Sequence, residues 1–130
     1  MNEHQASLLL IDDEEPNRVL ITRRLQDIGH RVTSAPGGHA GLELMRAERF
    51  DLVLLDLQMP ELDGLATLDL IKSDPALETV PVIMLTASRT RESVIHCLSL
   101  GAADYLIKPV VPAELQRRVQ AALDKGTERP

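Results

Sequence analysis

Short apolar runs of the sequence end in polar residues whose types could bind a metal or perform nucleophilic chemistry. There are five such residues: Asp12, Asp13, Asp56, Thr86 and Lys108. The central run, Leu52–Leu55, shows no polar alternation, which is typical of a strand buried on both faces of a parallel sheet. In open α/β sheets, ligands bind at the edge where the carboxyl ends of the strands meet. The sequence therefore predicts that the five side chains gather at one edge of a sheet.

The charge of this set favours a divalent cation. Its three carboxylates carry more negative charge than the single lysine neutralises. Mg²⁺ suits such a site because it takes oxygen ligands, keeps several waters and is usually shared with a substrate phosphate. We expect Asp13 and Asp56 to bind the ion directly and Asp12 to bind it mainly through water. The backbone carbonyl of Gln58 is expected to complete the protein ligands.

The residues after Asp56 predict a loop. Pro60 has no N–H group and biases Met59 away from the helical region, so regular structure stops there. Asp63 and Gly64 then supply turn chemistry before the next helical pattern begins. Asp56 is thus expected at the carboxyl end of a central strand, at the mouth of a loop.

Apolar runs alternate with helical patterns along the chain, which predicts five strand–helix units. The expected strands cover residues 8–11, 31–34, 52–55, 81–85 and 104–107. The expected apolar faces of the helices are Ile21, Leu25 and Ile28; Ala40, Leu44 and Ala47; Leu65, Leu68 and Ile71; Val94, Cys97 and Leu98; and Leu115, Val119 and Leu123. Pro16 and Pro112 suit the first turns of the first and last helices. Gly29 and Gly101 are typical helix stops, and residues 126–130 are expected to form a frayed tail.

Parallel strands joined by helices need crossovers, and these are right-handed almost without exception. The predicted fold is therefore a doubly wound α/β domain with a five-stranded parallel sheet. In the strand order 2-1-3-4-5, strand 2 is added on one side of the first strand and strand 3 on the other, so the strand order reverses between the first and third strands. That reversal brings Asp12 and Asp13 next to Asp56.

Length and composition favour one soluble domain without nucleic acid or membrane contacts. The chain has 130 residues, 44% of them hydrophobic, and a net charge of −6. An acidic chain with only two aromatic residues offers neither a basic patch nor a stacking platform for nucleic acid. A single cysteine, Cys97, fits a reducing compartment. No apolar run approaches the length of a membrane span, and residues 1–7 are not a signal peptide, so we expect a cytoplasmic protein.

The polar residues and the segments around them resemble the receiver domain of response regulators in two-component signalling systems. The matching segments are Asp12-Asp13, Asp56 with residues 59–64, Thr86-Ala87, residues 101–106 and Lys108-Pro109. The resemblance covers about residues 7 to 124, and five short motifs in this order are far more specific than any one of them. It implies a flavodoxin-like receiver fold with strand order 2-1-3-4-5 and a single domain over residues 1–130.

The resemblance also implies a role for each matching residue. Asp56 would accept a phosphoryl group from a histidine kinase or phosphotransfer protein, with Mg²⁺ bound beside it. Thr86 and Lys108 would contact that group, Tyr105 would be the switch aromatic, and the bond before Pro109 would be cis. The domain would catalyse only its own phosphorylation and dephosphorylation, so we do not expect an enzyme in the usual sense. We further expect the fourth helix, fifth strand and fifth helix to form a partner or homodimer surface.

Single positions of the sequence disfavour other function classes. An aspartyl phosphatase commonly carries a second acid two residues after its nucleophile, and that position holds Gln58 here. A phosphorylation-independent module of receiver shape usually lacks an acidic or lysine position, and this chain keeps them all. A flavin or dinucleotide domain is disfavoured because acidic residues 12–15, not a glycine-rich loop, follow the first strand. The sequence is compatible with a stand-alone regulator and with the input domain of a larger protein.

Overall fold

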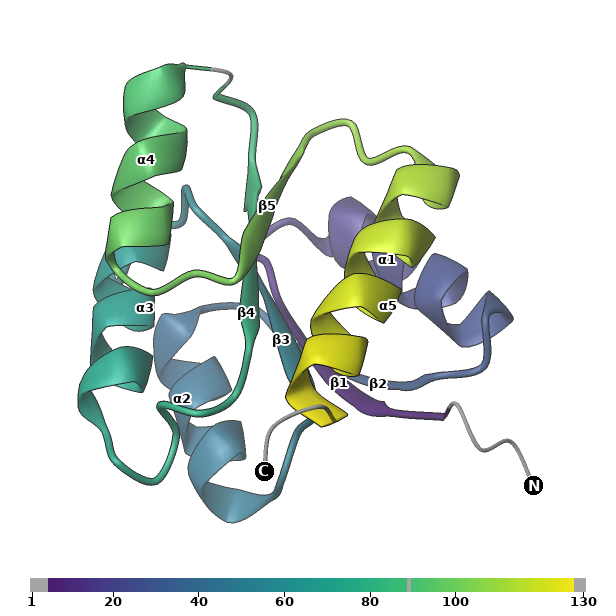
Figure 1. The fold of residues 1–130 in the computed structure, drawn as a ribbon, viewed down its shortest axis with the longest axis horizontal. Coiled ribbons are helices and arrows are strands. Elements are labelled where there is room, and N and C mark those ends of the chain that lie inside the picture. The colour runs from purple at the N-terminus through teal and green to yellow at the C-terminus, as the bar shows by residue number, and fades with distance from the viewer. Residues whose placement is uncertain (1–4, 89, 128–130) are drawn as a thin grey trace.

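The computed structural model describes residues 5–88 and 90–127 as a five-stranded parallel sheet with a helix after each strand (Figure 1). The strands are β1 (Ser7–Ile11), β2 (Arg31–Ala35), β3 (Leu52–Asp56), β4 (Val82–Thr86) and β5 (Asp104–Ile107). The helices are α1 (Glu15–Asp27), α2 (Gly38–Ala47), α3 (Gly64–Ser73), α4 (Arg91–Ser99) and α5 (Pro112–Thr127). The strand order is β2-β1-β3-β4-β5, which confirms the predicted topology.

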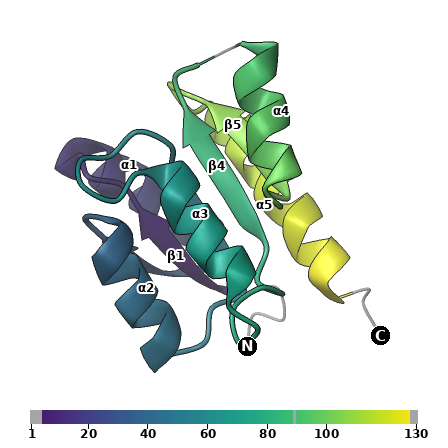
Figure 2. The same ribbon diagram turned by 90° about the vertical axis from the view of Figure 1, so that its left-hand side faces the viewer.

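Helices cover both faces of the sheet. Figures 1 and 2 show α1 and α5 on one face and α2, α3 and α4 on the other. Successive residues of a strand point to opposite faces, so β1 divides its side chains between two cores. Leu9 and Ile11 pack with the α2–α4 layer, and Leu8 and Leu10 pack with α1 and α5. This division explains why Leu8–Ile11, Leu52–Leu55 and Val82–Leu85 are continuous apolar runs.

The register of the central strands places the acidic residues at one level. Leu8 of β1 pairs with Leu52 of β3, and Ile11 pairs with Leu55. Asp12 and Asp56 each come one residue after that last pair. The two aspartates therefore leave neighbouring strands side by side.

Local sequence signals explain where several helices begin and end. The Asp63 side chain caps α3 by accepting a hydrogen bond of 2.8 Å from the backbone N–H of Ala66. Pro16 lies in the first turn of α1, as predicted. Gly29 and Gly101 follow α1 and α4 with φ angles of 97° and 106°, a left-handed conformation that favours glycine. Both helix stops are thus confirmed.

Two predicted helix faces are partly wrong. Leu98 was expected to point inward, but it is 43% exposed, because Cys97 and the half-buried Val94 already turn α4 towards the sheet. Ala47 is exposed at the end of α2, whose buried residues are Gly38, Gly41, Leu42 and Met45. Gly41 lets α2 approach Ile11 of the sheet closely, and Gly38 lets it approach Thr67 of α3. The spacing of larger apolar residues alone therefore predicted the wrong buried face.

The last helix is longer than expected. α5 continues through Gly126 to Thr127, so the frayed tail predicted for residues 126–130 began too early. Residues 128–130 lie outside the described residues. Across residues 5–88 and 90–127, no helix combines the length and the apolar character that crossing a membrane requires.

Candidate functional site

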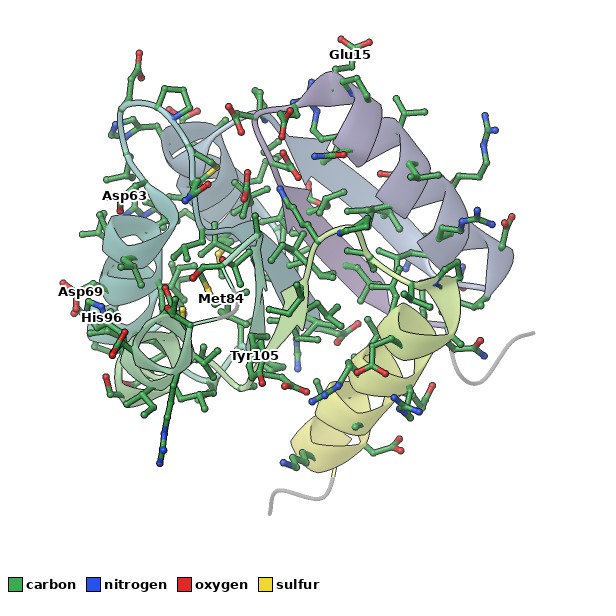
Figure 3. All side chains as sticks on the ribbon, turned by 90° about the horizontal axis from the view of Figure 1, so that it is seen from above. Glu15, Asp63, Asp69, Met84, His96 and Tyr105 are labelled. Atoms are coloured by element: carbon green, nitrogen blue, oxygen red, sulfur yellow. The ribbon has the colours of Figure 1, made fainter. Side chains whose placement is uncertain are left out.

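The candidate site lies at the edge of the sheet where the strands end. Figure 3 looks onto this edge, with the beginnings of α1 and α3 on opposite sides of it, marked by Glu15 and Asp63. β1, β3, β4 and β5 deliver Asp12, Asp56, Thr86 and Lys108 to this edge in turn. Side chains that are far apart in the sequence are thereby brought together.

Three carboxylates gather at this edge. One oxygen from each of Asp12, Asp13 and Asp56 lies within 4.8 Å of the other two. Asp12 is fully buried, Asp56 is 3% exposed, and Asp13 is the most accessible of the three. Like charges at this spacing repel one another in a partly dry environment. A cation bound among these carboxylates would relieve this repulsion.

Asp12 is held by contacts on every side. Its amide donates to the backbone oxygen of Ala35 in β2 at 3.1 Å, and its Oδ1 accepts from the backbone N–H of Glu14 at 2.9 Å. Its own backbone carbonyl accepts a hydrogen bond of 2.7 Å from Nη1 of Arg18 in α1. Its position is therefore set by the sheet and by the start of α1 together.

Lys108 supplies the positive charge of the site. Its Nζ lies 3.0 Å from Oδ1 of Asp56 and 3.4 Å from Oδ2 of Asp12. The lysine is placed by its backbone N–H, which donates to the Thr86 carbonyl at 2.8 Å. The Lys108–Pro109 peptide bond is cis. One ammonium group thus bridges two of the three carboxylates.

Burial and neighbouring charges have opposing effects on the pKa values of Asp56 and Lys108. Burial raises the pKa of Asp56 from 3.8 to about 6, with a further rise from Asp12, against the lowering effect of Lys108 and of the Gln58 amide. Burial lowers the pKa of Lys108, but Asp56 and then Asp12 outweigh it and hold that pKa above its usual range. At neutral pH, Asp56 is therefore mostly an ionised, poorly solvated carboxylate paired with a charged lysine.

Thr86 and Gln58 flank Asp56. Thr86 is 2% exposed at the end of β4, and its Oγ1 accepts a hydrogen bond of 2.9 Å from the Ser88 amide. The Gln58 amide donates to Oδ1 of Asp56 at 3.3 Å, while its side chain is exposed. These two neighbours complete the polar lining around the Asp56 carboxylate.

The loop after Asp56 returns closely to the end of β3. The Gly64 amide donates to the Leu57 carbonyl at 3.0 Å. A Cβ atom on Gly64 would lie 2.3 Å from the Asp56 backbone oxygen, so only glycine fits there. Glu61 within the loop has a φ angle of 64°, which is uncommon for a residue with a side chain.

Tyr105 stands apart from the carboxylates. It lies on the edge strand β5, between α4 and α5 in Figure 3, and is half-buried against the α2–α4 core. It precedes Lys108 by three residues. The structure therefore brings Asp12, Asp13, Asp56 and Lys108 together, with Thr86 and Gln58 alongside and Tyr105 further down the edge strand.

Sequence reasoning missed two residues that shape the site. Gly64 was interpreted only as a turn residue, although its lack of a side chain lets the loop touch the end of β3. Arg18 was not assigned to the site at all, although it binds the Asp12 carbonyl. A glycine after a helix-capping aspartate was the available signal for the first, and no pattern in the sequence signals the second.

Comparison with known proteins decides the family. Residues 8–120 match the family model of the response regulator receiver domain. The chain belongs to this receiver family. A probable transcriptional regulator, ycf27, of Guillardia theta is 40% identical over 121 residues, which are 93% of this chain and 46% of that protein. The first relatives matched are longer, and the chain spans between 27% and 53% of their length.

Solved receiver structures share the fold. The receiver domain of a sensor histidine kinase from Pseudomonas aeruginosa PAO1 is 33% identical with a TM-score of 0.85, covering 92% of this chain and 98% of that one. That crystal structure contains a magnesium ion coordinated in its active site cleft. The chemotaxis protein CheY4 of Vibrio cholerae is 28% identical with a TM-score of 0.86, covering 91% of this chain and 98% of that one. The chain is thus a two-component signalling receiver in both sequence and fold.

Proposed function

We propose that Asp56 accepts a phosphoryl group from a phosphohistidine of a histidine kinase or phosphotransfer protein. The observation that carries this proposal is the pairing of a buried carboxylate at the end of the central strand with Lys108 Nζ at 3.0 Å. A carboxylate oxygen of Asp56 attacks phosphorus, and the phosphorus–nitrogen bond of the donor breaks. The electron pair stays on the imidazole nitrogen, and Asp56 becomes an acyl phosphate.

The residues present fit Mg²⁺. Three hard oxygen donors lie within 4.8 Å of one another, and the single lysine leaves them with excess negative charge. We assign Asp13 and Asp56 as direct ligands, Asp12 as a ligand mainly through water, and the Gln58 carbonyl as a fourth protein group. When bound, the ion supplies neutralising charge next to the transferring group. The magnesium ion in the active site cleft of the related Pseudomonas receiver supports Mg²⁺ as the ion.

The protein's own groups prepare the transfer. The pKa of about 6 leaves most of Asp56 ionised at neutral pH, so the nucleophile is available without a base. Lys108 shares its charge between Asp56 and Asp12 and is held by the Thr86 carbonyl. Its ammonium group is placed to pair with a phosphoryl oxygen, a contact that counts most where charge develops.

Signal output is proposed to run from Thr86 to Tyr105. A phosphoryl group on Asp56 offers new acceptor oxygens to the Thr86 hydroxyl, which now accepts from the Ser88 amide. Movement of Thr86 would change the space beside β5, where Tyr105 lies half-buried. We assign the surface of α4, β5 and α5 as the partner or homodimer face. The net charge of −6 favours a protein partner over nucleic acid at this domain.

The acceptor is tested by intact-mass measurement after incubation with acetyl phosphate and Mg²⁺. The parent chain is expected to gain one phosphoryl group and Asp56→Asn none. Asp51→Asn is the matched control, because Asp51 is an exposed aspartate beyond the other end of the same central strand, and this variant should be modified like the parent. Equal modification of Asp56→Asn would refute the assignment.

A further inference from the structure

Arg18 is a second cationic side chain at the carboxyl edge of the sheet, and it contacts backbone. Its Nη1 donates a hydrogen bond of 2.7 Å to the carbonyl oxygen of Asp12. The arginine lies early in α1 and is half-buried. Among residues 5–88 and 90–127, no carboxylate forms an ion pair with it. Its guanidinium group therefore acts on one peptide unit.

That peptide unit joins Asp12 to Asp13. A peptide unit is planar from one Cα atom to the next. The direction of the Asp12 carbonyl oxygen therefore fixes the orientation of the plane that contains the Asp13 nitrogen and Cα atom. Asp12 has other restraints, because its amide and its carboxylate both bind backbone groups and its side chain is fully buried. The Asp13 carboxylate makes no hydrogen bond or ion pair with any other described residue. Asp13 thus depends on the orientation of its backbone.

We propose that Arg18 is a positioning residue for Asp13. By holding the Asp12–Asp13 peptide, it fixes the direction from which the Asp13 carboxylate meets a bound Mg²⁺. This inference rests on the proposed function and deepens it. Mg²⁺ demands near-ideal octahedral geometry, and residues that orient metal ligands change metal affinity by about 10- to 100-fold when they are mutated.

Charge and positioning predict opposite effects of removing Arg18. A fixed cation near the cluster repels Mg²⁺, so its removal would tighten binding if charge were its whole effect. Loss of the hydrogen bond to Asp12 would instead free the Asp13 backbone and weaken binding. The sign of the change in Mg²⁺ affinity therefore separates the two roles.

The test measures the Mg²⁺ dissociation constant by titration calorimetry for the parent chain, Arg18→Met and Arg24→Met. Arg18→Met is expected to raise the constant about tenfold. Arg24→Met removes the same charge from the exposed surface of the same helix, without a site contact, and is expected to bind as the parent does. A second readout is the Asp12 carbonyl carbon shift in metal-free protein, which should move in Arg18→Met alone.

The possible results lead to different conclusions. Unchanged or tighter Mg²⁺ binding by Arg18→Met would overturn the positioning role while leaving the proposed function intact. Absence of Mg²⁺ binding by the parent chain would overturn both. If Arg18→Met loses the folded amide spectrum, Arg18→Gln is measured in its place, with the same expected rise and the same contrary result.

Discussion

The two edges of the sheet each bury titratable groups, but they balance charge differently. At the amino edge, His30 is 5% exposed, and its Nδ1 accepts a hydrogen bond of 3.1 Å from the Ala6 amide. Asp51 nearby accepts from the Ser7 amide at 2.8 Å. Burial lowers the pKa of His30, against a smaller rise from Asp51, so the ring is neutral at pH 7. Both His30 and Asp51 have a backbone partner, and the charge that acts on His30 is the opposite charge of Asp51.

The carboxyl edge satisfies its hydrogen bonds equally well but leaves charge in excess. Across the described residues, no buried side-chain nitrogen or oxygen lacks a partner. At this edge, however, three carboxylates lie together, and the one ammonium group of Lys108 pairs with only two of them. Burial of a titratable group therefore does not by itself mark a functional site, because both edges show it. The clustering of like charge around one counter-charge distinguishes the edge that would take a ligand.

The largest expected effect is stabilisation of the fold by Mg²⁺, which should depend on the carboxyl edge and not on the amino edge. Saturating Mg²⁺ is expected to stabilise the fold by about 2.7 kcal/mol at one hundred times its dissociation constant, because it binds the folded state. The thermal midpoint should rise by several degrees, and Asp13→Ala should abolish most of the rise. Asp51→Asn, at the amino edge, should keep it. The same rise in Asp13→Ala as in the parent would contradict the site.

Asp56→Asn tests the cost of the buried carboxylate in metal-free protein. The folded pKa of about 6 exceeds the ordinary 3.8, so the protonated acid favours folding below pH 4 and that stability is lost as pH rises through 6. At pH 7, the neutral amide should therefore stabilise the fold by on the order of 2 kcal/mol. Urea unfolding from pH 4 to pH 8 would show this, followed by circular dichroism because the chain has no tryptophan. A gain that does not depend on pH would argue against this cause.

His30→Asn tests the opposite pH slope at the amino edge. A histidine whose folded pKa is lowered stabilises the fold above its ordinary pKa of 6.5 and loses that stability as pH falls. We expect the parent to lose stability from this group as pH falls below 6.5. Asparagine can accept from the Ala6 amide without titrating, so the variant should lack this loss. Parallel pH profiles of parent and variant would show that His30 titrates normally.

The smallest expected effect concerns communication between the site and the edge strand. Beryllofluoride with Mg²⁺, which mimics the acyl phosphate, is expected to shift the ring signals of Tyr105 in the parent. Thr86→Ala should still accept phosphate but lose most of that shift, because the hydroxyl that would follow the phosphoryl group is gone. Signals of Ala6 and His30 should stay in place in both proteins. A silent Tyr105 with Asp56 saturated would place the output face elsewhere.

The strands could be predicted from short apolar runs, and the gathering of the carboxylates from the strand order of a parallel sheet. An apolar run such as Leu52–Leu55 can only be buried on both faces, and parallel strands end at a common edge. The order of strands one and three then places Asp12 beside Asp56. Helix stops at Gly29 and Gly101 follow from the conformation that glycine alone adopts easily.

What could not be predicted depends on distances between elements. The exposure of Leu98 depends on the rotation of α4 about its own axis relative to the sheet. The spacing of Val94, Cys97 and Leu98 in the sequence does not determine that rotation. The contact of Arg18 with the Asp12 carbonyl requires the exact angle at which α1 leaves β1. The close approach of Gly64 to Asp56 appears only once the loop is closed. Each of these features results from tertiary packing, and no pattern in the sequence predicts it.

The loop that follows Asp56 is closed at its neck by the hydrogen bond from Gly64 to Leu57. Within the loop, Met59 is buried in the core and Leu62 packs against it, whereas Pro60 and Glu61 are exposed and Glu61 has a positive φ angle. Because the neck is held independently, chain added after Pro60 would lengthen the loop outward without displacing Asp56. Doubling the length of a flexible loop costs only about 0.6 kcal/mol in closure entropy. We therefore expect a peptide inserted at the exposed Pro60–Glu61 position to leave Asp56 in place.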